Sequence, residues 1–174
     1  MKKTVSILLI LAALMCMLFV GCGDSTAPSA EATPNAPSAP AKEYVFSYNG
    51  ISIPMKAEAA PIVSQLGEPL NYFESESCAF KGLDKIYTYA SFELCTYPVD
   101  GVDYVLSVRF TNDTVSTAEG ISIGSSLDSL NTVYSSSVAV GETGFTLTGG
   151  DSSLAFILDG STGAVTSVKY SANN

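Results

Sequence analysis

Two short phrases occur twice in this chain, in the same order, and this repetition constrains the fold more than any other feature. Gly-Ile-Ser-Ile occupies residues 50–53 and again residues 120–123. A second phrase, Val-x-Ser-Val followed by a basic and an aromatic residue, occupies residues 105–110 and again residues 165–170. Self-similarity of this kind is the signature of internal repeats. The sequence therefore predicts a tandem repeat of two units.

The residues between the repeated phrases indicate what each unit contains. In the first unit, apolar residues at helical spacing predict a short helix that ends at Gly67. In the second unit, Leu127 and Tyr134 belong to a similar pattern. Each helix is followed by short β-branched or aromatic runs separated by turn residues, which predict antiparallel strands. We therefore expect an α+β fold with units at residues 44–112 and 113–171, each a short helix packed on an antiparallel meander sheet.

Two turns have sharp sequence signals. Asn49 and Gly50 predict a type I′ hairpin, because both residues tolerate a positive φ. Asp100 and Asp103 surround a second turn, and their carboxylates could suggest calcium. We favour an ordinary hairpin turn over a calcium site for these two aspartates, because no EF-hand phrase accompanies them. We expect neither a metal site nor a cofactor.

The N-terminal residues are typical of an exported protein. Two lysines precede an uncharged apolar run at residues 4–20, which has the length of a signal peptide. Residues 18–22 resemble the lipobox of bacterial lipoproteins, in which the chain is cleaved before a cysteine that carries a diacylglyceryl group. The resemblance implies that residues 1–21 are removed between Gly21 and Cys22. It also implies that Cys22 bears acyl chains such as palmitate. The alternative is an ordinary signal peptide in which Cys22 is incidental.

Residues 22–42 form the predicted link between this cysteine and the folded part. They are rich in Ala, Pro and Ser and contain no large apolar side chain, so they cannot bury enough surface to fold. We expect a disordered stalk that carries the folded part at the outer face of the cell membrane.

The charge balance excludes some partners. The chain has 8 basic and 17 acidic side chains, a formal net charge of −9. Nucleic-acid binding requires a cationic surface, so it is not expected. Electrostatic docking on anionic lipid is not expected either, which leaves the acyl chains as the membrane anchor.

Two further resemblances concern the folded part. The phrase at residues 120–126, followed by a helix and a meander, resembles the β-lactamase inhibitor protein fold, itself a tandem of two such units. A related single unit occurs in small lipoproteins of the outer-membrane assembly machinery, the SmpA/OmlA type. Residues 75–98 resemble a recurrent segment of lipoproteins from anaerobic Gram-positive bacteria. These resemblances, over residues 44–170, imply a protein-binding or assembly module, although the inhibitor family has a disulfide in each unit and this chain has none available in the second.

Few catalytic groups are available to this chain. It contains no histidine, which excludes Ser-His-Asp catalysis and imidazole metal sites. Cys78 and Cys95 form a candidate disulfide, because an extracytoplasmic location permits pairing. In a simple meander they would lie two strands apart, about 10 Å, which is too far for a bridge. Pairing therefore requires the first strand to leave the sheet early; the alternative is two buried free thiols.

Acidic and aromatic residues suggest two different functions. Glu74 and Glu76 share one face of a predicted strand and, with Glu93, could serve a carboxylate-based hydrolase of cell-wall glycans. The alternative for these acids is a solvated strand face. A candidate binding patch consists of four tyrosines that either form an interface or pack as core under the helix: Tyr87, Tyr89, Tyr97 and Tyr104.

We favour a binding function over catalysis. The expected protein is a membrane-anchored extracytoplasmic lipoprotein that captures an envelope or extracellular protein or peptide and has no catalytic residue. The glycan hydrolase and a structural envelope-assembly factor are the alternatives.

Overall fold

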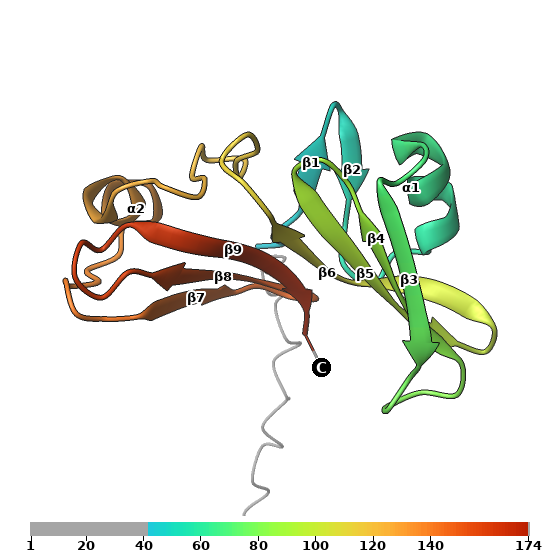
Figure 1. The fold of residues 1–174 in the computed structure, drawn as a ribbon. Helices are drawn as coiled ribbons and strands as arrows, with labels where there is room; N and C mark the ends of the chain where they lie inside the picture. The colour runs from blue at the N-terminus through green and yellow to red at the C-terminus, as the bar shows by residue number, and fades with distance from the viewer. Residues whose placement is uncertain (1–41, 174) are drawn as a thin grey trace, which may run out of the picture. The chain divides into compact units, whose positions relative to one another are not determined.

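A computed structural model describes residues 42–173 of the chain (Figure 1). The predicted signal peptide with Gly21, the predicted lipidation site Cys22 and almost all of the predicted stalk lie outside these residues. Neither helix within 42–173 has the length and hydropathy needed to cross a membrane. In chain order the elements are β1 (Phe46–Tyr48), β2 (Ile51–Ile53), α1 (Ala59–Leu66), β3 (Asn71–Glu76), β4 (Leu83–Thr88), β5 (Phe92–Val99), β6 (Val102–Phe110), α2 (Leu127–Tyr134), β7 (Gly144–Thr148), β8 (Ser152–Leu158) and β9 (Val165–Ala172).

Seven strands form one antiparallel sheet in the order β3-β4-β5-β6-β9-β8-β7. The strands β1 and β2 form a separate two-stranded hairpin. Figure 1 shows the hairpin and both helices on the same side of the sheet. We call this side the helix face. The opposite side, which no helix of the described part covers, is the open face.

The expected tandem of two helix-on-sheet units is wrong. Instead of two sheets, the structure has a single seven-stranded sheet with two short helices. The reason lies in the repeated Val-x-Ser-Val strands, which are β6 and β9. They pair with each other in the middle of the sheet, with Val108 opposite Tyr170 and Arg109 opposite Lys169. The two copies of this phrase, which were expected to lie in separate units, therefore pair with each other and join all the strands into one sheet.

A single hydrophobic core lies under the helix face. Phe46 of the hairpin is 1% exposed, and its ring lies 5.2 Å from that of Phe92, 5.1 Å from Phe110 and 5.8 Å from Tyr170. These three partners come from β5, β6 and β9. Apolar residues of α1 and α2 complete the same core: Ala59, Ile62, Leu127 and Leu130.

Several local predictions are confirmed. Asn49 and Gly50 both have positive φ, 50° and 81°, and join β1 to β2 in a tight hairpin. The helix α1 is followed by Gly67 at φ 79°, a conformation that favours glycine. The sequence predicts that the second helix begins at Ser125 or Ser126, and in the structure the side chain of Ser126 accepts a hydrogen bond from the backbone N–H of Ser129 and so caps the start of α2.

Asp159 organises the turn between β8 and β9. Its carboxylate accepts hydrogen bonds from the backbone N–H groups and the hydroxyls of Ser161 and Thr162. These bonds, that of the Ser161 hydroxyl above all, hold the pKa of Asp159 well below its usual value. A lowered pKa in the folded state means that the ionised carboxylate stabilises the fold.

We expect Asp159→Ala to lower the urea midpoint at neutral pH. The stabilisation is present above the unfolded-state pKa of about 3.9 and is lost as the pH falls through the lower folded-state value. The difference in midpoint between wild type and variant should thus be constant down to about pH 5 and narrow below about pH 4. Asp113→Ala, at an exposed aspartate in the loop after β6, is the control. A difference for Asp159→Ala that persists unchanged into acid would contradict this account.

Candidate functional site

The four tyrosines of the predicted patch do not lie together. Tyr87 and Tyr89 belong to the helix face, whereas Tyr97 and Tyr104 lie directly opposite each other on the open face. Tyr89 is 7% exposed and its ring stacks on that of Phe92 at 5.0 Å, so it is part of the core. The separation follows from the register of β4 and β5, which places odd-numbered residues of one strand opposite even-numbered residues of the other.

The open face carries its own aromatic cluster. The rings of Tyr97 and Tyr104 have centroids 6.0 Å apart, and the ring of Phe80 lies 5.0 Å from that of Tyr97. Phe80 comes from the loop between β3 and β4, which therefore reaches over this face. Large apolar side chains elsewhere on this face are also exposed: Phe73, Val99, Val102, Leu106 and Ile157. A sheet face of this composition is a candidate interaction surface.

A cavity of about 570 Å³ adjoins this cluster. Asp84 contributes a carboxylate oxygen, Oδ1, that is buried and has no hydrogen-bond partner within the described residues. For a ligand in this cavity, the aromatic rings provide apolar contact. The cavity is lined by Lys56, Ser77, Ala79, Phe80, Asp84, Tyr97, Leu106, Ala172 and Asn173.

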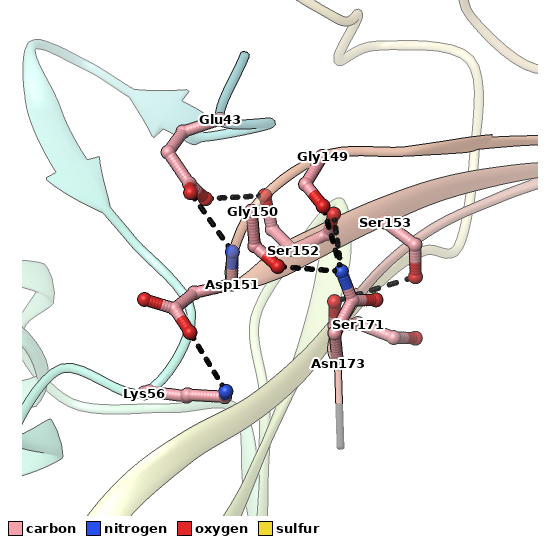
Figure 2. Close-up of polar contacts among 9 residues, drawn as sticks. All are labelled: Glu43, Lys56, Gly149, Gly150, Asp151, Ser152, Ser153, Ser171 and Asn173. Atoms are coloured by element: carbon pink, nitrogen blue, oxygen red, sulfur yellow. Dashed lines mark hydrogen bonds and ion pairs between the residues drawn. The ribbon is translucent and has the colours of Figure 1, made fainter. Parts of the chain in front are cut away.

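A polar network fixes one wall of this cavity (Figure 2). The amide of Asn173 donates to three backbone carbonyls of the β7–β8 turn, those of Gly149, Gly150 and Ser152. Lys56 forms an ion pair of 2.8 Å with Asp151 of the same turn. Asp151 also donates its backbone N–H to Glu43. Figure 2 shows that the network joins four parts of the chain, so Lys56 and Asn173 are held at the cavity.

A further residue of the cavity lining lies at a bulge in β6. The register between β5 and β6 shifts after Cys95, which pairs with Ser107, whereas Thr96 pairs with Val105. Leu106 is the additional residue. It is 38% exposed and lines the cavity on the open face. The bulge places two consecutive residues, Leu106 and Ser107, between Val105 and Val108, which both belong to the helix face, so the strand returns to the core at Val108.

A second cavity, also of about 570 Å³, lies on the helix face between α1 and β3. Tyr72 and Tyr87 form its sheet side, with ring centroids 5.1 Å apart. Burial raises the pKa of the Tyr87 hydroxyl above its ordinary value. Tyr87 therefore lines the cavity on the helix face, whereas Tyr97 lines the cavity on the open face. The lining is completed by Val63, Ser64, Gly67, Glu68 and Pro69.

The candidate catalytic acids are not gathered in one place. Glu74 and Glu76 are exposed on the helix side of β3. Glu93 lies on the open face and forms an ion pair of 2.5 Å with Arg109. Within residues 42–173 no group of three His, Cys, Asp or Glu side chains could hold a metal ion.

Cys78 and Cys95 are free thiols in this structure. The strand β3 ends at Glu76, so Cys78 lies in the exposed loop beyond it, while Cys95 is half-buried on β5. Burial raises the pKa of the Cys95 thiol, which disfavours the nucleophilic thiolate. Pairing of the two cysteines stays a prediction.

Comparisons with protein-family models, with curated proteins and with solved structures find no match for this chain. The resemblances drawn from the sequence therefore stay predictions.

Sequence reasoning missed Phe80 and Leu106. Phe80 could have been found from its position: it is a large aromatic residue in a turn between two strands, where no large apolar side chain is required. No sequence signal distinguishes Leu106, because the bulge at which it lies is a feature of the pairing between β5 and β6.

Proposed function

We propose that this protein is a lipid-anchored extracytoplasmic lipoprotein that binds a protein or peptide on the open face of its sheet, without catalysing a reaction. The observation that carries the proposal is the aromatic cluster of Phe80, Tyr97 and Tyr104 beside a cavity of about 570 Å³. Tyrosine and phenylalanine provide large contact areas at a small cost in side-chain entropy, which suits a binding surface.

The distribution of acids also favours binding. A glycan hydrolase of the usual type needs two carboxylates that flank one scissile bond. Glu93 is separated from Glu74 and Glu76 by the thickness of the sheet, and Glu93 is paired with Arg109. Glu74 and Glu76 themselves are exposed on an edge strand rather than in a recess that excludes water. Such acids are typical of a solvated surface.

Photo-crosslinking in intact cells tests the proposal. A photoreactive amino acid at Leu106 should yield a defined adduct with a partner, because Leu106 lines the cavity. The double variant Tyr97→Ser/Tyr104→Ser should reduce that adduct at least about tenfold, since two central aromatic contacts are lost. The same photoreactive group at Val140, which is 62% exposed in the loop after α2, is the matched control and should give no such adduct.

Two results would contradict the proposal. One is equal crosslinking from Leu106 and Val140, or crosslinking that is unchanged by the tyrosine substitutions. The other is release of product from purified cell-wall glycan that disappears in Glu74→Gln or Glu76→Gln, which would establish a carboxylate enzyme.

A further inference from the structure

The strand β3 is an unprotected edge of the sheet. It is the first strand in the sheet order and pairs only with β4 within the described residues. All six of its residues, from Asn71 to Glu76, are exposed. Proteins usually shorten, cover or distort such an edge, because its free backbone groups can pair with another chain. A six-residue edge strand is long enough to accept a partner strand.

The register shows which backbone groups of β3 are free. The backbone N–H of Ser77 donates to the carbonyl of Gly82, so this pair is hydrogen-bonded toward β4. Hydrogen-bonded and non-hydrogen-bonded pairs alternate along an antiparallel ladder. The N–H and C=O groups of Tyr72, Glu74 and Glu76 must then point away from the sheet. These three residues offer three donor and acceptor pairs to an incoming strand.

The cavity on the helix face lies beside this edge. Tyr72 forms part of its lining, opposite Val63 of α1. Tyr72 is 44% exposed, and the neighbouring Leu70 is 76% exposed. A strand added to β3 would place one side chain next to Tyr72 on the helix face, where this cavity of about 570 Å³ can receive it. The walls formed by Val63, Tyr72 and Tyr87 suit an apolar side chain.

The charges along the edge define the rest of the ligand. Glu74 and Glu76 follow Tyr72 on the same face of β3, which carries no basic residue. Opposite Glu74 on β4 lies Lys85, but Lys85 forms an ion pair of 2.7 Å with Asp103. Cross-strand pairs of opposite charge are favourable. An incoming strand should therefore place basic side chains opposite Glu74 and Glu76.

We propose that β3 binds an extended basic segment of a partner protein as an additional antiparallel strand. The segment has the pattern basic-x-basic-x-apolar, with the basic residues opposite Glu76 and Glu74 and the apolar residue opposite Tyr72. A second copy of this chain is a poor occupant, because two β3 strands would bring four glutamates together on a chain of net charge −9. This edge is distinct from the open face, and the proposal does not depend on the function assigned to that face.

Hydrogen exchange on the full chain in detergent micelles tests the inference. The probe is the capped peptide Lys-Thr-Lys-Thr-Val, and the control is the scrambled peptide Lys-Lys-Val-Thr-Thr, of equal charge. The first peptide should bind at least about tenfold more tightly than the second. It should newly protect the amides of Tyr72, Glu74 and Glu76 from exchange, while those of Phe73 and Ser75, already bonded to β4, change little.

Substitutions separate the backbone and charge contributions. Glu74→Pro removes an outward N–H, which an edge strand tolerates, and should weaken binding at least about tenfold at any salt concentration. Glu74→Gln keeps that N–H and should weaken binding less, with a smaller salt dependence. If Glu74→Pro fails to fold, amide protection in the wild-type chain and Glu74→Gln still decide the question. Tyr97→Ser/Tyr104→Ser should bind the peptide normally.

Four results would overturn the inference. The first is equal affinity for the two peptides, and the second is absence of new amide protection at Tyr72, Glu74 and Glu76. The third is loss of peptide binding in Tyr97→Ser/Tyr104→Ser while Glu74→Pro binds normally. The fourth is protection of the same three amides without peptide, through self-association of the chain.

Discussion

Replacing Phe46 by alanine is expected to lower the free energy of unfolding by about 3–5 kcal/mol, the usual cost of deleting a buried aromatic ring. The Phe46 ring contacts Phe92, Phe110 and Tyr170, so its removal leaves a cavity bounded by three different strands. Urea denaturation monitored by tyrosine fluorescence measures the loss. Phe73→Ala is the matched control, because Phe73 is 55% exposed and its loss should cost less than about 0.5 kcal/mol.

The same variant reports on cooperativity. Phe46 joins β5 and β6 to β9, and β9 pairs with β8, so the core on both sides of the β6–β9 junction should unfold together. We expect one transition, shifted as a whole to lower urea. A loss below about 1 kcal/mol for Phe46→Ala would contradict the central place of this ring in the core. Two separate unfolding transitions, of which Phe46→Ala shifts only the first to lower urea, would contradict the single core itself.

Local structure was predictable because its signals are local. The Asn49-Gly50 hairpin, the helix before Gly67 and the cap at Ser126 each depend on residues within a few positions of one another. The arrangement of the sheet was not predictable in this way. Pairing of β6 with β9 joins residues about sixty positions apart, such as Val108 and Tyr170, and a repeated phrase is compatible with two sheets or with one.

The residues of the candidate site were also only partly predictable, because their positions depend on strand register. Tyr87 and Tyr89 share a strand face, as residues two apart on a strand do. Whether Tyr97 joins them depends on the parity of the β4–β5 register, which the sequence does not show. A shift of one residue would have placed all three on the same face. The sequence does not show the bulge at Leu106 either, because the run of residues around it reads as an ordinary strand.

The proposed membrane anchor leads to the second large effect. Replacing Cys22 by serine should abolish incorporation of radiolabelled palmitate, because the proposed acyl chains have no other thiol to occupy at the cleavage site. Cys16→Ser is the matched control, since Cys16 lies within the same apolar run and should leave labelling unchanged. The measurement is label per molecule of protein recovered from membranes. Labelling of Cys22→Ser at the wild-type level, or loss of labelling in Cys16→Ser, would contradict the lipobox assignment.

The charge of the chain adds a condition to this prediction. With 17 acidic and 8 basic side chains, the protein gains nothing from attraction to anionic lipid, so washing membranes with concentrated salt should not release it. Burial of acyl chains contributes about 0.8 kcal/mol per CH₂ group, and two chains anchor a protein stably where one is marginal. Because salt leaves this hydrophobic contribution intact whereas detergent removes it, wild type should partition into the detergent phase and resist salt. Release of the wild-type protein by salt alone would mean that charge, rather than acyl chains on Cys22, holds it at the membrane.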